Sequence, residues 1–268
     1  VDQGDNISSE EDLYNIHAQG YVGGLTAGAQ SVMASFNRWQ GDKIHGSEYL
    51  LTQVLKDRMG FDGFVVGDWN GHGQVAGCSN ESCPQAINAG LDIFMAPTQS
   101  WRPLFANTVA QVQDGTIPMS RIDDAVTRIL RVKARAGIFD RPSPEKRAYS
   151  GKMELIGHPD HRAVAREAVR KSLVLLKNNN VLPINPKSNI LVAGDAADNI
   201  GKQSGGWTIT WQGTNNTNAD FPGGSSIYAG IADSVNAAGG KVTLSVDGSF
   251  DTNAGNKPDV AIVVFGEE

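Results

Sequence analysis

The sequence predicts an α/β fold built on parallel strands, because short apolar segments alternate with helical segments about every 30 residues. The apolar segments of the first half are SVMASF (31–36), FVVG (64–67) and LDIFM (91–95). Their nearly continuous apolar character is typical of strands that are buried on both faces. Three strands are too few to close a (β/α)8 barrel. We therefore expect either an open sheet or one part of a barrel.

Helices are predicted between and after these strands, at 10–29, 47–59, 83–89, 101–114 and 120–136. The last is the best marked. Ser120 is placed to cap its N-terminus, Asp123 and Asp124 fall in its first turn, and Gly137 follows its end. Its basic residues are interpreted as a solvated face: Arg128, Arg131, Lys133 and Arg135.

A charged stretch with several prolines, 140–159, predicts a linker between two α/β regions. After it we expect a helix at 161–176, strands at 190–193, 241–246 and 260–265, and a helix at 225–238. A long loop, 194–224, carries two tryptophans, which argues against disorder. The predicted division is a first α/β region at 1–139, a linker with its helix at 140–185, and a second α/β domain at 186–268.

The composition excludes several classes of function. The chain has 23 basic and 29 acidic residues, a net charge of −6, and we expect no nucleic-acid partner. No apolar run approaches the roughly 18 residues of a membrane-spanning helix. Cys78 and Cys83 lie in a polar loop with His72 as the only other nearby ligand type, so we expect no metal site. A local disulfide is favoured over two free thiols and indicates an oxidising compartment.

The segment GFDGFVVGDWNGHG (60–73) carries the strongest chemical signal. It places Asp68 at the C-terminal end of a buried strand, where reactive groups gather in parallel α/β folds. Trp69 follows directly. An indole can pack against the apolar face of a pyranose while a carboxylate stabilises or attacks its anomeric carbon. From the pattern alone, an equal alternative is that Asp68 caps a helix and Trp69 is a core aromatic.

A second aromatic segment is GGWTITWQG (205–213). If it is extended, Trp207, Ile209 and Trp211 point to one side. The two indoles then form either a stacking wall for a sugar or an apolar plug between domains, and both interpretations stay open.

These segments together resemble glycoside hydrolase family 3. The resemblance also covers AGLDIFM, IPMSRIDDAVTRILRVKARAGIFD (117–140), HRAVAREAVRKSLVLLKNNNVLPI (161–184) and ILVAGDAADNIG. It extends over nearly the whole chain and is strongest to exo-acting β-glucan glucohydrolases. It implies that residues 1–139 are the C-terminal part of a TIM-like (β/α)8 barrel and that 186–268 begin an α/β sandwich domain.

The resemblance also implies roles for single residues. Asp68 matches the family's nucleophile, and Trp69 and Trp211 match the pair that clamps the leaving sugar. The family's proton donor is a Glu that would lie beyond residue 268. Glu267 and Glu268 precede that position, so neither is the expected acid/base.

Two positions depart from the family pattern. Phe36 stands where relatives often have a Tyr near the nucleophile, and a phenolic hydrogen bond to Asp68 would be lost. Gln74 stands where relatives carry an Arg, which would loosen the leaving-group site. Met95 is expected to line the first sugar pocket or to be ordinary core.

Lys43 and His45 are polar candidates for the pocket rim, and His72 is a weaker candidate for an acid. The function implied is retaining hydrolysis of terminal β-glucosyl residues from β-glucan oligosaccharides or β-glucosides by a secreted or periplasmic enzyme. It needs no cofactor, and further segments of the same enzyme would lie upstream and downstream. The alternatives are an N-acetyl-β-hexosaminidase of the same family and a non-catalytic sugar- or nucleotide-binding α/β protein.

Overall fold

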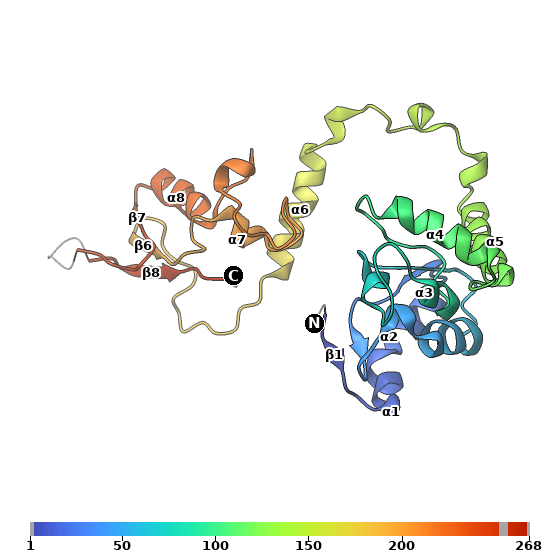
Figure 1. Cartoon of the computed structure of the whole chain (residues 1–268). Helices are drawn as coiled ribbons and strands as arrows, with labels where there is room; N and C mark the ends of the chain where they lie inside the picture. The colour runs from blue at the N-terminus through green and yellow to red at the C-terminus, as the bar shows by residue number, and fades with distance from the viewer. Residues whose placement is uncertain (1–2, 252–256, 267–268) are drawn as a thin grey trace. The chain divides into compact units, whose positions relative to one another are not determined.

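The computed structural model describes residues 3–251 and 257–266. Both regions of the chain are α/β, and they form two compact units, Val1–Met153 and Glu154–Glu268 (Figure 1). The boundary falls inside the predicted linker. Within the described residues, no helix is both long and apolar enough to cross a membrane.

The first unit contains two of the three parallel strands that were expected. β2 (Ser31–Met33) pairs in parallel with β5 (Phe64–Val66), and a π-helix, η3 (Tyr49–Arg58), connects them. α3 (Pro84–Ala89) then leads to the segment 91–95, which joins β5 through a parallel bridge between Val66 and Ile93. Three parallel segments thus follow one another, with a helix before the second and the third.

The third segment is not a regular strand, which corrects the prediction for 91–95. The Asp92 carboxylate accepts the Val65 N–H at 2.7 Å, and the Val65 carbonyl accepts both the Asp92 and the Ile93 N–H. The Asp92 side chain therefore accepts an N–H that a main-chain carbonyl would accept in a regular pair of strands. The hydrogen-bond pattern of a strand is thereby interrupted.

The core of this unit forms between β5 and the helices that flank it. Val65 is completely buried, and Phe61, Leu51 and Leu91 are at most 4% exposed. Gly63 allows the starts of β2 and β5 to approach closely, because a Cβ there would lie 2.2 Å from the Gln30 carbonyl oxygen. Burial of these apolar side chains fixes the end of β5 relative to its neighbours.

The N-terminal region differs from the single helix expected at 10–29. α1 (Glu10–Asp12) begins at the Ser9 cap, continues as a π-helical segment, η1 (Leu13–His17), and is followed by α2 (Gln19–Thr26). The short strands β1 (Asp5–Asn6), β3 (Arg38–Trp39) and β4 (Asp42–Lys43) form a separate small sheet, before the 3-10 turn η2 (Ile44–Gly46).

Two helices close the first unit, α4 (Trp101–Gln113) and α5 (Met119–Arg135). The expected cap is wrong: α5 begins one residue earlier than predicted, Pro118 occupies the cap position, and Ser120 lies inside the helix. The predicted end is confirmed, because Gly137 follows the helix with φ 64°, a conformation that glycine adopts at little cost.

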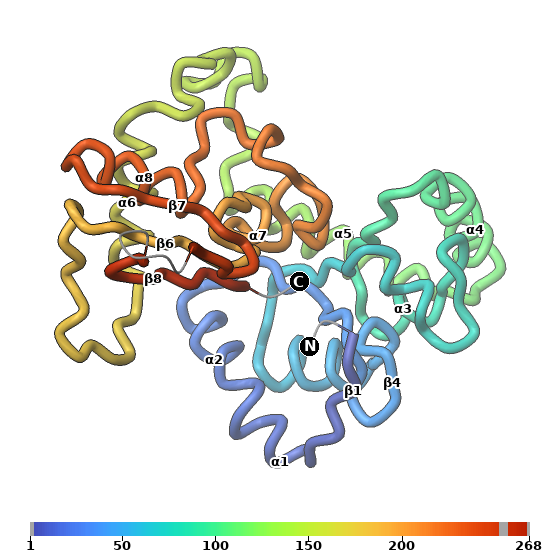
Figure 2. Tube along the Cα trace, turned by 90° about the vertical axis from the view of Figure 1, so that its left-hand side faces the viewer, coloured from blue at the N-terminus to red at the C-terminus, as the bar shows by residue number. Residues whose placement is uncertain are grey.

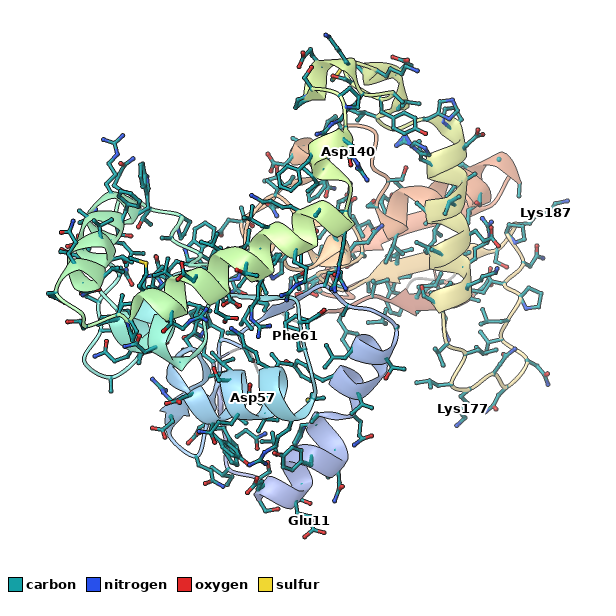
Figure 3. All side chains as sticks on the ribbon, turned by 90° about the vertical axis from the view of Figure 1, so that its right-hand side faces the viewer. Glu11, Asp57, Phe61, Asp140, Lys177 and Lys187 are labelled. Carbon is teal, nitrogen blue, oxygen red and sulfur yellow. A yellow bond between two sulfur atoms is a disulfide. The ribbon has the colours of Figure 1, made fainter. Side chains whose placement is uncertain are left out.

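The basic residues of α5 do more than face solvent, which corrects the prediction. Arg128 donates to the carbonyls of Phe61 and Gly63, and Arg131 donates to the carbonyl of Asp62. Arg135 forms a two-pronged ion pair with the Asp62 carboxylate. The helix α5 is therefore hydrogen-bonded to the turn that leads into β5, near Phe61 (Figure 3). Lys133 is exposed, as expected.

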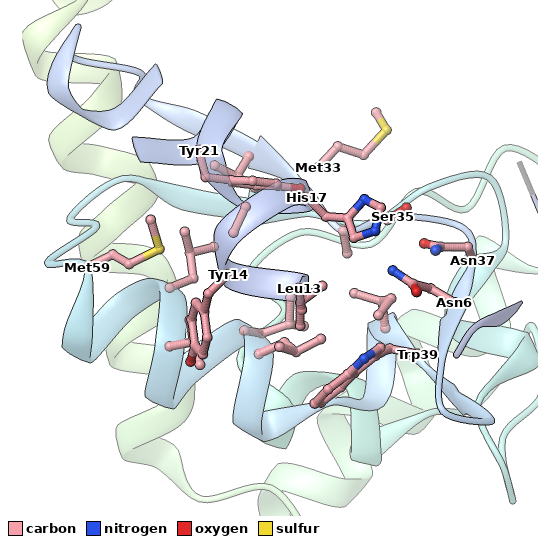
Figure 4. Close-up of a pocket in the computed structure, with 18 residues that line it drawn as sticks. Asn6, Leu13, Tyr14, His17, Tyr21, Met33, Ser35, Asn37, Trp39 and Met59 are labelled. Carbon is pink, nitrogen blue, oxygen red and sulfur yellow. The ribbon is translucent and has the colours of Figure 1, made fainter. Parts of the chain in front are cut away.

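A cavity of about 280 Å³ lies between β2, η1 and η3. Figure 4 shows Leu13, Tyr14 and Trp39 around it, and its lining is mostly apolar. Among the described residues it is lined by no Asp, Glu, Lys or Arg, so Asp68 does not face it. Because no carboxylate lines this cavity among the described residues, it is not the candidate active site.

The second unit contains a parallel sheet. β6 (Asn189–Ala193) lies between β7 (Lys241–Ser245) and β8 (Val260–Val263), and α8 (Ile227–Ala237) precedes β7 (Figure 2). The turn η5 (Ile138–Asp140) ends at the first residue of the predicted linker, and the described residues between it and the next helix hold only the single turns η6 (Pro144–Lys146) and η7 (Met153–Leu155). α6 (Pro159–Ser172) ends four residues before its predicted end, because Leu173 is extended.

The long loop 194–224 is more ordered than its composition suggests. It contains α7 (Ile200–Ser204) and the turn η8 (Asn218–Asp220). Asn218 accepts the Ile200 N–H and donates to the Asp198 carbonyl, while Asn216 donates to the carbonyls of Thr208 and Gly213. Asparagine side chains thus supply the bonds that a strand or helix would otherwise provide.

Candidate active site

Asp68 lies at the C-terminal end of β5, as predicted, separated from the strand only by Gly67. Its side chain is partly buried, while the indole of Trp69 is 58% exposed. The alternative of a core aromatic is therefore wrong for Trp69. Asn70 follows in the left-handed conformation, with φ 53°, and turns the chain sharply after the carboxylate.

The main chain around Asp68 is fixed from two sides. Gly67 donates to the Ile93 carbonyl at 2.8 Å, and Asn70 donates to the Met95 carbonyl at 2.9 Å. The Asp68 carbonyl accepts the Gly71 N–H at 2.9 Å and closes the turn. Met95, a predicted pocket residue, is thus placed beside the turn by its backbone, with a half-buried side chain.

The loop after the turn is stabilised by a disulfide between Cys78 and Cys83, which confirms the local bond expected from their spacing. His72 is 1% exposed, shares a 3.0 Å hydrogen bond with the Asn80 carbonyl and packs on Phe94. Burial lowers the pKa of His72. These contacts give His72 a structural role in the loop.

Lys43 and His45 are not at a rim, which corrects the prediction. Lys43 is 6% exposed and His45 is fully buried behind the turn. His45 Nε2 accepts the Asp68 N–H at 2.8 Å. Sequence reasoning missed this contact, because nothing in the local pattern KIHGS distinguishes a buried histidine from an exposed one.

Phe36 and Gln74 belong to the same group of side chains. The Phe36 ring meets the His45 ring edge to face, with centroids 6.3 Å apart, and the Lys43 ammonium lies 4.0 Å from the Phe36 centroid. Lys43 also donates to the Phe36 carbonyl and, at 2.7 Å, to the Gln74 amide oxygen. A neutral amide suits this place, because an arginine would bring a second positive charge against the buried ammonium.

The tryptophan loop belongs to the second unit. It is not extended, which corrects the prediction: Trp207 and Ile209 have positive φ angles, and the Trp207 N–H donates to the Trp211 carbonyl at 2.8 Å. The indoles of Trp207 and Trp211 are 84% and 57% exposed. They are therefore held at the two ends of a tight turn and not along one face of a strand.

Glu267 and Glu268 lie outside the described residues. Among residues 3–251 and 257–266, no group of three or more His, Cys, Asp or Glu side chains is arranged to hold a metal ion.

The candidate site thus combines a half-buried carboxylate, fixed at a strand end, with an exposed indole. Residues 2–132 match the glycosyl hydrolase family 3 N-terminal domain, and residues 173–268 match the family's C-terminal domain. The chain belongs to glycosyl hydrolase family 3. Asp68 and its neighbours fall in the N-terminal domain of the family, and the tryptophan loop falls in the C-terminal domain.

Similar proteins agree with this membership. A Q683A mutant of the exo-1,3/1,4-beta-glucanase ExoP from a Pseudoalteromonas species is 53% identical, with a TM-score of 0.91, and the match covers 100% of this chain and 42% of that one. The lysosomal beta glucosidase of Dictyostelium discoideum is 32% identical over 90% of this chain and 31% of its own length. The periplasmic beta-glucosidase of Salmonella typhimurium is 31% identical over 75% and 27%. This chain therefore spans less than half the length of each.

Proposed function

We propose that this chain is part of a retaining, exo-acting β-glucan glucohydrolase or β-glucosidase, and that Asp68 is its nucleophile. The observation that carries the proposal is the placement of Asp68. It is a half-buried carboxylate at the C-terminal end of a parallel strand, its main chain is fixed on both sides, and an exposed indole follows it. Membership of the family and the names of its similar proteins support glucosides as substrates.

In the proposed reaction, an Asp68 oxygen bonds to the anomeric carbon as the bond from that carbon to the leaving oxygen breaks. A second carboxyl group donates its proton to the leaving oxygen and later removes a proton from the water that releases glucose. In a retaining enzyme the two groups are roughly 5 to 5.5 Å apart. We propose that a Glu outside residues 1–268 supplies this group.

The other candidate residues are proposed to bind the sugar. The indoles of Trp69 and Trp211 are each proposed to stack on the leaving sugar, and Trp207 lies at the other end of the Trp211 turn. Met95, beside the turn, would line the first sugar pocket. Phe36 and Gln74 would shape the site indirectly, since both contact Lys43 beneath it.

The proposed architecture follows from the same membership. Residues 1–139 would be the C-terminal part of a (β/α)8 barrel, 140–185 the linker and its helix, and 186–268 the first part of an α/β sandwich. The consecutive parallel segments of the first unit and the parallel sheet of the second support this assignment. The disulfide and the periplasmic relative support a secreted or periplasmic location.

The experiment is chemical rescue of Asp68→Gly in the full-length protein. Loss of the nucleophile should reduce hydrolysis of an aryl β-glucoside by at least about 10⁴-fold. Azide should restore release of the aryl group and give the α-glucosyl azide, because it attacks the face that Asp68 vacates. Asp57→Ala is the control, since this exposed carboxylate on η3 has no hydrogen-bond or ion-pair partner among the described residues. Undiminished activity of Asp68→Gly would refute the assignment.

The same assay tests the substrate. We expect an aryl β-glucoside to be hydrolysed faster than the corresponding N-acetylglucosaminide. The opposite preference would identify an N-acetyl-β-hexosaminidase instead.

A further inference from the structure

The buried His45 contacts the main chain of the proposed nucleophile. Its Nε2 accepts the Asp68 N–H at 2.8 Å, and its ring is 0% exposed. Because Nε2 accepts, it carries no proton, so the imidazole is neutral with its proton on Nδ1. Nδ1 itself has no hydrogen-bond partner among the described residues.

The described strands offer the Asp68 N–H no carbonyl acceptor, and His45 Nε2 accepts it instead. On one side of the turn, the carbonyls of Ile93 and Met95 accept the N–H groups of Gly67 and Asn70. On the other side, the last bond between β2 and β5 runs from the Ala34 N–H to the Val66 carbonyl. The Asp68 N–H lies beyond this last bond, and its acceptor is Nε2 of the His45 imidazole.

The ring is confined on three sides. A Cβ on Gly71 would lie 2.4 Å from both Cε1 and Nε2 of His45, so only glycine fits at position 71. Gly67 lies against the same ring, since a Cβ there would be 3.4 Å from its Cδ2. The Phe36 ring packs edge to face against it. The turn that presents Asp68 is therefore packed directly on the imidazole.

We propose that His45 is a positioning residue, which holds the main chain of Asp68 so that its carboxylate keeps a fixed approach to the anomeric carbon. This inference rests on the proposed role of Asp68 as nucleophile. It assigns no contact between His45 and substrate. Misplacement of a reacting group by about 1 Å can lower a rate by about 10²-fold.

Burial and the positive charge of Lys43 keep the His45 imidazole neutral, so that its Nε2 can accept a hydrogen bond. Burial, with the positive charge of Lys43 and the nearby His72, lowers the pKa of His45 to about 4, and Asp68 opposes this shift. The imidazole is therefore neutral above about pH 4, and above that pH its Nε2 can accept the Asp68 N–H.

The test compares His45→Gln with His45→Asn in the full-length protein. Both place a buried amide at this position, but only the longer Gln reaches the place of Nε2 with an acceptor oxygen. We expect His45→Asn to lower kcat by about 10²-fold with KM changed less than about threefold. His45→Gln should recover at least about tenfold of that loss. His72→Asn, which removes another buried imidazole of the same region, should lower kcat less than His45→Asn does.

Several outcomes would overturn the inference: equal kcat for the Gln and Asn variants, a kcat of His45→Asn close to that of the wild type, or a loss confined to KM. Nitrogen NMR of the wild-type histidines gives a check that needs no variant, and a proton on Nε2 of His45 would also overturn it. Asp68→Gly is measured in parallel. If it stays active, the proposed function fails; if it is inactive while the His45 variants match each other, only the positioning role fails.

Discussion

Removal of the Asp92 carboxylate should strongly destabilise the first unit. The Asp92 side chain is 0% exposed and accepts from Lys56 Nζ at 2.8 Å and from the Val65 N–H at 2.7 Å. The Arg121 guanidinium forms a further ion pair with it. One carboxylate therefore connects η3, β5 and α5 below the candidate site.

The expected loss of stability follows from the contacts that remain to Lys56 in the Asp92→Asn variant. The Lys56 side chain is 3% exposed, and among the described residues it would keep only the Gly90 carbonyl at 2.7 Å and the partly exposed Asp124 at 3.7 Å as partners. Burial already lowers the pKa of Lys56, and the charge of Asp92 opposes that shift. Breaking a buried ion pair by removal of one partner costs about 3 to 5 kcal/mol. We expect about 3 kcal/mol, at the lower end of this range, because the Asn oxygen can still accept the Val65 N–H.

A second substitution separates the charge from the packing. Lys56→Met removes the ammonium that Asp92→Asn leaves uncompensated, so the double variant should be more stable than Asp92→Asn alone, by about 1 to 2 kcal/mol. The effects of the two substitutions would be additive if the two groups did not interact.

The assay is hydrogen exchange of the β5 amides in the full-length protein, since unfolding of several domains is not a two-state transition. The free energy of local opening at Val65 and Val66 is compared among the wild type, the two single variants and the double variant. A loss below about 1 kcal/mol for Asp92→Asn, or further destabilisation by Lys56→Met in that background, would refute the reasoning.

Three more predictions concern the site and its loop. Because burial holds the pKa of His45 near 4, below its unfolded value of 6.5, the unfolded state binds the proton first. The stability contribution is therefore full above about pH 6.5 and falls by about 3 kcal/mol as the pH drops to about 4, and the free energy of opening from hydrogen exchange of the β5 amides should lack this slope in His45→Gln. Reduction of Cys78–Cys83 should cost about 2 kcal/mol for so short a loop, and a variant with Ala at both positions should not respond to reductant in the same exchange measurement. Trp69→Ala, at an exposed site, should leave stability within about 0.5 kcal/mol but lower kcat/KM about tenfold, whereas Trp69→Phe should retain most activity; equal loss in both would contradict a stacking role.

The elements predicted correctly are those with local signals. β5 was expected at 64–67 and is found at Phe64–Val66, because a short apolar run bounded by glycines needs no distant information. Gly137 ends α5 as its sequence position implies. The tryptophan loop was misjudged because alternation assumes extended backbone, and nothing in the local sequence indicates positive φ at Trp207 and Ile209.

The side chains interpreted wrongly are long or polar ones whose partners lie far away in the sequence. Arg128 resembles any solvated helix arginine, yet it binds carbonyls 65 and 67 positions away. Asp92 looks like a residue in a buried strand, and its role appears only when Lys56 and Arg121 are placed around it. Polar residues at element ends carry no periodicity, so their burial cannot be inferred from pattern.

The support of Asp68 shows why the site is harder to infer than its central residue. The carboxylate follows one strand, but its main chain is held by the segment 91–95 on one side and by the loop after β2 on the other. In a parallel fold, loops that are distant in sequence meet at the strand ends, and they are free to contribute either surface or support. Lys43 and His45 support the turn: they lie beneath it, and their hydrogen bonds are made with other groups of the protein. A polar residue in such a loop is therefore to be judged by the hydrogen bonds it makes and not by the strand end that it follows.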